Sequence, residues 1–521
     1  MIKTLTLIFA LSAALFSTQD LSAQATWSNG IGEIFFNHCS RCHHDGGIGP
    51  FPIMSYQDVA PSAAEMILEV EEGHMPPWPA DHTYRHFAFE NIVDDNELAL
   101  LQEWVSSGAP EGDVNNAPVP PVFSDASLLP QLDFTGETGS YASTAVNADA
   151  YRTFVIPSGF TTDEFIDGIE ILPGNPSIVH HVLIYYDPTN DCLDFDAADA
   201  GPGFETNGTG GGLPASVKYM GAWVPGNSAM ILPEGFAFLA EAGGYFLVEI
   251  HYPEGTDGMV DNTTVNFKFT SDPSPREVYM DPVINHFPPI LEAPFLYIPA
   301  NDTATFYASY NVPIDLTLIS TMPHMHLIGQ SLYCWGETPN NGDIPLVGID
   351  HWDFHWQYSY MYPSLLHLPD NTNLRAYAFY DNTPNNPHQP NDPPQPVLGG
   401  EETDDEMLVV FFVYAQYQNG DENIVVDPSV GVTEQKPNDL SVGVFPNPVS
   451  DVLNLNIFAT RHGESRILIH DNLGRCVQNE LASLHAGNNQ LRLNTQLLES
   501  GLYHLTMVHR GASTTQRFVV E

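Results

Sequence analysis

The sequence predicts a multidomain, mainly β protein with a small α-helical domain near its N-terminus. The chain has 521 residues, several times the usual size of one domain. Its 43 prolines and 40 glycines interrupt short runs of Val, Ile, Thr and aromatic residues, a pattern typical of β sandwiches or barrels rather than helix bundles. Hydrophobic residues make up 43% of the chain, so it can bury several cores.

The charge balance excludes one class of partner. Fifteen Lys and Arg stand against 65 Asp and Glu, which gives a formal net charge of −50. Such a field repels phosphate backbones and anionic lipid surfaces, so nucleic acid is not an expected partner.

The first segment, 1–25, is typical of a secretory signal peptide. Lys3 supplies the positive start, residues 5–15 are apolar but too few to span a bilayer, and residues 23–25 read Ala-Gln-Ala, a small-residue cleavage site. No later stretch reaches the roughly 20 uninterrupted apolar residues of a membrane-spanning helix. We therefore expect an exported protein that does not span a membrane.

Composition divides the remaining chain into three blocks. Apolar residues at three- and four-residue spacing predict helices over 63–72 and 95–107, within a small α domain at 26–112. The Pro-rich segment 113–131 is interpreted as a linker.

Short alternating strands, among them 152–156, 182–186, 246–251 and 408–415, indicate an all-β block that ends near residue 426. The polar segment 427–441 is a second linker. Further short strands around an Asp-Asn-Leu-Gly turn at 471–474 predict one small β sandwich over 442–521.

Residues 39–43 read Cys-Ser-Arg-Cys-His, the C-x-x-C-H pattern of covalent haem attachment. Cys39 and Cys42 would form the thioethers and His43 would bind the iron. A redox dithiol or half of a zinc site are the other interpretations, but neither a second C-x-x-C nor a βαβ pattern is present. The motif therefore predicts a c-type haem in the α domain.

The sixth iron ligand is expected from later in the same domain. Met75 lies in the Pro-rich loop Gly-His-Met-Pro-Pro-Trp-Pro at 73–79 and offers a thioether. We favour Met75, with His74 and His44 as alternatives.

Three histidine clusters occur in the β block. His180 and His181 precede one apolar strand, and His251 ends another. His324 and His326 form an H-x-H, whose two-residue spacing aims both imidazoles to the same side of a strand. Adjacent residues of a strand face opposite ways, so His180 and His181 reach one metal only if the strand start is bent. Together the clusters predict metal binding.

In this order the clusters, followed by Asp-Glu-Met at 405–407, resemble the copper type II, ascorbate-dependent monooxygenase family (the peptidylglycine α-hydroxylating and dopamine β-monooxygenases). The resemblance covers roughly residues 135–420. It implies two stacked jelly-roll sandwiches, at 132–272 and 273–426, and two copper ions.

The resemblance also implies which residues hold each copper. His180, His181 and His251 would form an electron-transfer site, and His324, His326 and Met407 the oxygen-binding, catalytic site. Imidazole suits copper in both oxidation states, and a thioether favours Cu(I). Met322 and Met325 are rival thioethers.

Two departures bear on the substrate. The peptide-amidating members have Arg two residues before the H-x-H and Tyr four residues after the Met, where this sequence has Met322 and Phe411. We therefore do not expect their peptide carboxylate clamp. Cys192 and Cys334 are candidates for a disulfide in an oxidising compartment.

The last block resembles the type A sorting domain of the bacterial type IX secretion system. Pro-Asn-Pro at 446–448 and Gly-Leu-Tyr at 501–503 carry the resemblance, which covers 442–521. It implies that the type IX machinery is a partner and that the protein is secreted or attached to the cell surface.

These features combine into one expected function. The chain would be a secreted haem- and copper-containing oxidoreductase, a copper-dependent monooxygenase that hydroxylates a small molecule or peptide with O₂. Electrons would pass through the c-type haem from an external one-electron donor, either ascorbate-like or a redox protein. The alternative is a non-hydroxylating surface protein that transfers electrons or binds copper.

Overall fold

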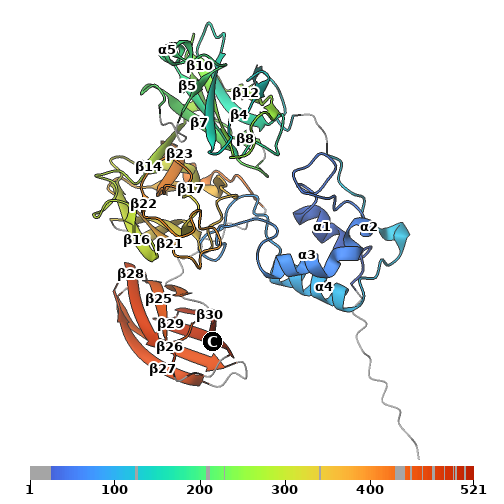
Figure 1. Ribbon diagram of the computed structural model, residues 1–521, viewed down its shortest axis with the longest axis vertical. Helices are drawn as coiled ribbons and strands as arrows, with labels where there is room; N and C mark the ends of the chain where they lie inside the picture. The colour runs from blue at the N-terminus through green and yellow to red at the C-terminus, as the bar shows by residue number, and fades with distance from the viewer. Residues whose placement is uncertain are drawn as a thin grey trace, which may run out of the picture. The chain divides into compact units, whose positions relative to one another are not determined.

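The computed structural model describes residues 25–520 (Figure 1), except for short gaps. The gaps are 124–126, 207–211, 228, 340–341, 429–439, 446–448, 460–461, 472–475, 486, 497, 499–500 and 510–511. Residues 1–24 of the expected signal peptide, most of the second linker and the Pro-Asn-Pro motif lie outside the described residues. The chain divides into two compact units, 1–76 with 92–123, and 77–91 with 124–521.

The first unit is helical. Its α-helices are α1 (Ile31–His38), α2 (Tyr56–Val59), α3 (Ala63–Glu71) and α4 (Asp95–Ser106), with 3₁₀ turns at Ala60–Ser62 and Val114–Asn116. Asp94 and Glu97 form a capping box that starts α4. The two predicted helices are confirmed as α3 and α4, and their apolar faces pack around the buried Trp27 and Trp104.

The second unit begins with a sandwich of two main sheets. One has the order β1 (Phe134–Glu137), β12 (Thr264–Phe269), β4 (Glu164–Leu172), β9 (Phe236–Ala240) and β13 (Arg276–Glu277), with β8 (Met230–Ile231) beside β4. The other has the order β6 (Phe204–Glu205), β3 (Ala150–Pro157), β10 (Tyr245–Tyr252), β5 (His181–Asp187) and β7 (Lys218–Trp223). A short pair, β2 (Tyr141–Ala142) with β11 (Val260–Asp261), and helix α5 (Cys192–Ala198) complete it.

A second sandwich follows from Tyr279. One sheet has the order β14 (Tyr279–Ile284), β23 (Val409–Gln416), β17 (Leu316–His324) and β20 (Tyr360–Leu368). The other has the order β16 (Asp302–Asn311), β21 (Asn373–Asn382), β18 (Gly329–Thr338) and β19 (Gly342–Ile349). The pair β15 (Tyr297–Ile298) with β22 (Val397–Leu398) and a 3₁₀ turn at Asp421–Asn423 are added to it.

The sheet that contains β23 is buried on both faces. Val410 and Phe412 face the core of the second sandwich, whereas Val409 and Phe411 join the core of the first. Residues 408–415 were expected to alternate but form an unbroken apolar run, because both faces of this strand are buried. The two sandwiches therefore share one hydrophobic cluster and bring the ends of β5, β10, β17 and β23 toward a common region.

The last residues form a third, smaller sandwich. Its sheets are β24 (Leu440–Phe445), β25 (Val452–Ala459) and β28 (Gly487–Asn494), and β27 (Cys476–Leu484), β26 (Gly463–Asp471), β29 (Gly501–His509) and β30 (Ala512–Val520). The mainly β fold class is thereby confirmed, as is a small C-terminal β sandwich. Among the described residues, no helix combines the length and apolarity needed to cross a membrane.

Two segments behave differently from their sequence interpretation. Residues 77–91, placed with the α domain, belong to the second unit, and we call them the strap. Within the predicted linker 113–131, Ala117 packs on the helical core and Leu129 is buried after Ser127 bonds Glu170. Parts of that linker are therefore packed against neighbouring elements, whereas most of its described residues are exposed.

Candidate metal and haem sites

The C-x-x-C-H turn directly follows α1. Cys39 ends the helix, and the amide of His43 donates to the Cys39 carbonyl at 3.0 Å. His43 Nδ1 lies 3.0 Å from the carbonyl oxygen of Phe51, a bond that places the ring proton on Nδ1. A Cβ added at Gly49 would stand 2.6 Å from the same Nδ1, so the loop fits closely around the ring. Nε2 is left as the atom able to bind iron, as a proximal haem ligand requires.

The two thiols do not have the character of a redox pair. Burial, with a smaller contribution from Cys42, raises the pKa of the Cys39 thiol to about 12, and burial also raises the pKa of Cys42. Redox-active dithiols instead hold a thiolate at lowered pKa. The raised pKa values therefore argue against a redox dithiol.

The three candidates for the sixth ligand have different surroundings. Met75 is half-buried in the bend after α3. His74 is exposed and pairs with Glu69 at 2.9 Å, while His44 stacks on Phe123 with ring centroids 3.9 Å apart. Both histidines are thus engaged elsewhere, and Met75 remains the candidate that we favour.

The proposed disulfide is not formed. Cys192 and Cys334 are both free thiols. Each is buried in a different hydrophobic cluster, Cys192 beside α5 in the first sandwich and Cys334 in the core of the second. The expectation of a Cys192–Cys334 pair was therefore wrong, because distance in the fold, rather than the oxidising compartment, decides which cysteines pair.

His180, His181 and His251 come together as the sequence predicted. β5 begins at His181, so His180 lies just before the strand. Its side chain therefore need not point to the face opposite that of His181. His181 is directly opposite His251 in the β5–β10 ladder, and the His180 amide donates to the His251 carbonyl at 2.9 Å. The bent strand start required for a shared metal is therefore present.

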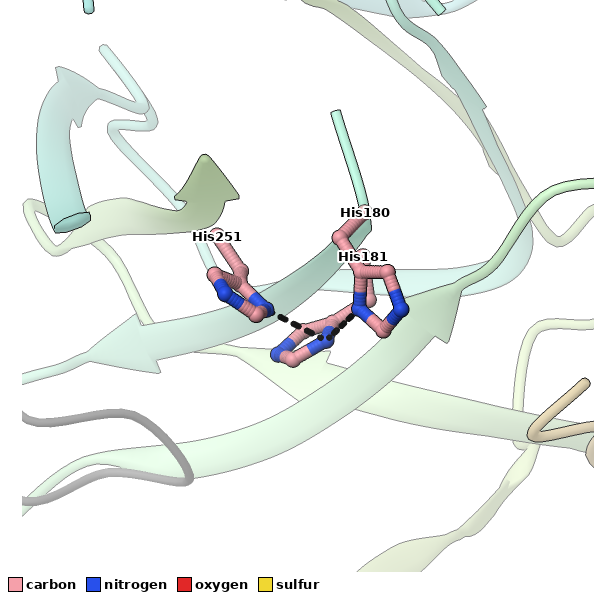
Figure 2. Close-up of side chains that lie close together, drawn as sticks. All are labelled: His180, His181 and His251. Atoms are coloured by element: carbon pink, nitrogen blue, oxygen red, sulfur yellow. Dashed lines mark hydrogen bonds between the residues drawn. The ribbon is translucent and has the colours of Figure 1, made fainter. Parts of the chain in front are cut away.

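The three rings direct the same kind of atom inward (Figure 2). His181 Nδ1 lies 3.3 Å from His180 Nδ1 and 3.4 Å from His251 Nδ1. Nitrogens bound at about 2.0 Å to one tetrahedral ion lie about 3.3 Å apart. The spacing thus fits a three-nitrogen metal site.

The protonation of this cluster suits a metal. His251 Nε2 lies 2.9 Å from Asp149 Oδ2, which keeps its proton on Nε2 and leaves the Nδ1 lone pair inward. Burial lowers the pKa of His180 to about 3 and that of His181 well below its usual value, so both rings are neutral. Burial alone would raise the pKa of Asp149, but its bond with His251 outweighs this and lowers it.

The second cluster presents the opposite nitrogens. His324 Nδ1 bonds to Gln357 Oε1 at 2.5 Å, and His326 Nδ1 to the Asp405 carbonyl at 3.2 Å. Both protons are therefore held on Nδ1, and Nε2 is the available ligand atom in each ring. His324 Nε2 is buried without a hydrogen-bond partner in the described part of the chain, as expected of an atom that awaits a ligand.

Met407 belongs to the same cluster of elements. His324 is paired with Val409 where β17 ends and β23 begins, and His326 and Met407 each lie two residues beyond that pair, outside the strands. Glu406 Oε2 accepts from the amides of His326 and Met407 at 2.9 and 3.1 Å and so ties the two ligand segments together. Met325, by contrast, belongs to the core of the second sandwich.

Phe354 stands between the two clusters. Its ring stacks on His180 with centroids 4.7 Å apart and meets the edge of His326 at 5.9 Å. The same loop provides Trp352, whose indole N–H donates to the His326 carbonyl at 3.0 Å, and Gln357. One segment therefore supports both sites.

Sequence reasoning missed these supporting residues. Asp149, Phe354 and Gln357 are not metal ligands and match no spacing rule. The one available signal was the run His-Trp-Asp-Phe-His-Trp-Gln-Tyr at 351–358, an unusual density of aromatic and imidazole side chains in a segment between strands.

Comparison with known proteins identifies the last domain. Residues 443–521 match the family described as secretion system C-terminal sorting domain, so the type IX sorting domain is confirmed. No curated protein matches the chain.

Solved structures similar to part of the chain are β-glucuronidases. Those of Faecalibacterium prausnitzii and Parabacteroides merdae are 10% and 11% identical, each over 42% of this chain, with a TM-score of 0.13. The match covers 37% and 29% of those enzymes, respectively. At this TM-score the likeness says nothing about function.

Proposed function

We propose that the protein is a secreted copper-dependent monooxygenase that receives electrons through a covalently attached haem c. One observation supports this most: two separate histidine clusters offer opposite nitrogens, three Nδ1 atoms in one and two Nε2 atoms in the other. This arrangement suits two copper ions in unlike surroundings, the first held by His180, His181 and His251, the second by His324, His326 and Met407.

The ligand types favour copper over other metals. Neither cluster directs a carboxylate inward as a ligand, which argues against calcium, magnesium and manganese. Neutral imidazoles together with a thioether suit copper that alternates between Cu(I) and Cu(II). When bound, copper would supply the one-electron chemistry and the binding of dioxygen.

The chain's own residues have three tasks. Asp149, Gln357 and the Asp405 carbonyl hold the ring protons of His251, His324 and His326, respectively, so that each of these three imidazoles presents a lone pair to its site. Glu406 positions His326 relative to Met407, and Phe354 packs between a ligand of each cluster. The overall reaction places one oxygen atom of O₂ in a C–H bond of the substrate, and two electrons and two protons convert the other to water.

The substrate is proposed only as a class. Met322 and Phe411 replace the peptide-clamping Arg and Tyr, so a small organic molecule, or a peptide bound without a carboxylate clamp, fits better. The sorting domain directs the protein through the type IX machinery to the outside of the cell. The external one-electron donor must therefore act there.

A second function is favoured by Phe354. Because its ring touches a ligand of each cluster, the two sites are joined by packed side chain, as in a protein that only transfers electrons. A surface electron carrier or copper-binding protein without hydroxylation is therefore the rival.

Metal analysis, haem spectroscopy and oxygen uptake test the proposal together. We expect two coppers per chain, haem that stays on the protein in acid–acetone, and substrate-dependent oxygen uptake by the reduced protein. His324→Ala should lose one copper and retain the other. If both coppers are bound and oxygen uptake does not increase with any organic substrate tested, the electron-carrier function would be supported instead.

A further inference from the structure

The strap, residues 77–91, connects the haem unit to one particular copper site. It begins at Pro77, two residues after Met75, and belongs to the second unit. The Asp81 amide donates to the Gly348 carbonyl and the Ala88 amide to the Met361 carbonyl, both at 2.8 Å. The strap therefore forms part of the folded copper core.

Trp78, the second residue of the strap, makes two aromatic contacts. Its ring lies 5.8 Å from that of Tyr358 and 5.4 Å from that of Tyr360, measured between centroids. Its indole N–H is buried without a hydrogen-bond partner among the described residues. Since the N–H group makes no hydrogen bond there, the contact with Tyr358 and Tyr360 depends on the aromatic ring of Trp78.

From Tyr358 the connection continues to the second cluster. Gln357 is the adjacent residue, and its side-chain oxygen accepts from Nδ1 of His324. The sequence of contacts is thus Trp78 ring, Tyr358 ring, Gln357 side chain and His324 ring, with one contact between rings and one hydrogen bond.

We propose that electrons from the haem reach the second copper site through Trp78, Tyr358 and Gln357, without passing through the first. This rests on the proposed function, since it assumes haem at His43 and copper at His324 and His326. In the step, the ferrous haem gives up one electron and becomes ferric, and Cu(II) gains it and becomes Cu(I). No bond is made or broken.

The physical reason is that electron transfer slows steeply as the gap between donor and acceptor widens. Aromatic rings in contact shorten those gaps, and a charge-assisted or short hydrogen bond adds little further distance. The strap provides such a series inside the folded protein, whereas Phe354 connects His326 with the first site only.

The experiment follows the haem absorption band after a flash. The oxidised holoprotein, without oxygen, is photoreduced at the haem by a flavin semiquinone, and reoxidation of the haem by copper is recorded. We expect Trp78→Leu to slow reoxidation about tenfold or more, and Trp78→Phe to stay close to the wild type.

Tyr84→Leu is the matched control. Tyr84 is a buried aromatic residue of the same strap, but its ring packs on Tyr333, 5.1 Å away, and leads away from His324. Reoxidation in this variant should equal that of the wild type. Copper content and the urea midpoint of each variant show whether the strap has remained folded.

The choice of copper site is tested by removing each one. Haem reoxidation should persist in His181→Ala, which lacks the first copper, and stop in His324→Ala. The reverse result would overturn the route, as would equal rates in Trp78→Leu and the wild type. A wild-type protein that binds no copper or no haem would instead refute the proposed function.

Discussion

Gln357 shows how a single uncharged side chain can decide the chemistry of a metal ligand. Its oxygen holds the His324 proton on Nδ1 and leaves Nε2 outward. Replacing it with Leu keeps the size but removes the acceptor, so we expect Gln357→Leu to weaken copper binding at the second site about 10- to 100-fold. Titration with Cu(I) measures this. Gln357→Glu retains an acceptor and should bind nearly normally; equal affinity in Gln357→Leu would contradict the role.

Phe354 should contribute to stability as well as to the geometry of the two sites. Its ring is 8% exposed and contacts imidazoles from both sandwiches. We expect Phe354→Ala to lower the free energy of unfolding of the copper core by about 3–5 kcal/mol through the cavity it leaves. Urea denaturation of the metal-free protein checks this. Exposed Phe89, substituted in the same way, is the control, and a comparable loss there would show that the site is not special.

At the scale of elements, the hairpin of β18 and β19 carries a like-charge pair. Glu337 is directly opposite Asp343, and burial, followed by this neighbour, raises the pKa of Asp343 to about 6. The folded state therefore binds more protons than the unfolded state between about pH 4 and pH 6. Stability from this group is present at the acidic end and is lost as the pH rises through that window.

Asp343→Asn tests the hairpin. The variant should lack this fall in stability between about pH 4 and pH 6 and should be more stable than the wild type at pH 7. Thermal unfolding at a series of pH values measures the difference. A parallel pH dependence in the two proteins would show that Asp343 is ionised alike in both states.

The elements also show how far sequence reasoning reaches. The histidine ligands were predictable because their spacing relates directly to strand geometry, and β5, β10 and β23 begin and end within two residues of the expected ranges. Asp149 and Gln357 were not, because each acts on a ligand distant in sequence. The strap was missed for the same reason: its Trp, Tyr and Phe side chains resemble any loop until β19 and β20 are placed beside them.

At the scale of the whole molecule, the net charge of −50 should govern which donors work. A negative field repels anions and attracts cations before contact, and salt screens it within about 8 Å at physiological ionic strength. We expect a cationic one-electron reductant to reduce the protein faster than ascorbate at low salt, with the difference narrowing as salt is added. Stopped-flow absorbance of the haem measures both. A ratio independent of salt would show that local groups, rather than the net charge, select the donor.

The course of the strap has one more consequence. The chain passes from the helical unit to the second unit after Pro76, returns after Asn91 and passes over again after Phe123. A protease cut between residues 123 and 127 would therefore not release the N-terminal fragment, because the strap, which belongs to that fragment, is packed in the second unit. Likewise, a gene truncated after residue 112 would produce a helical unit whose strap lacks the sandwich on which it packs. A gene begun at residue 127 would produce the second unit without its strap. The two units should therefore be expressed and purified together.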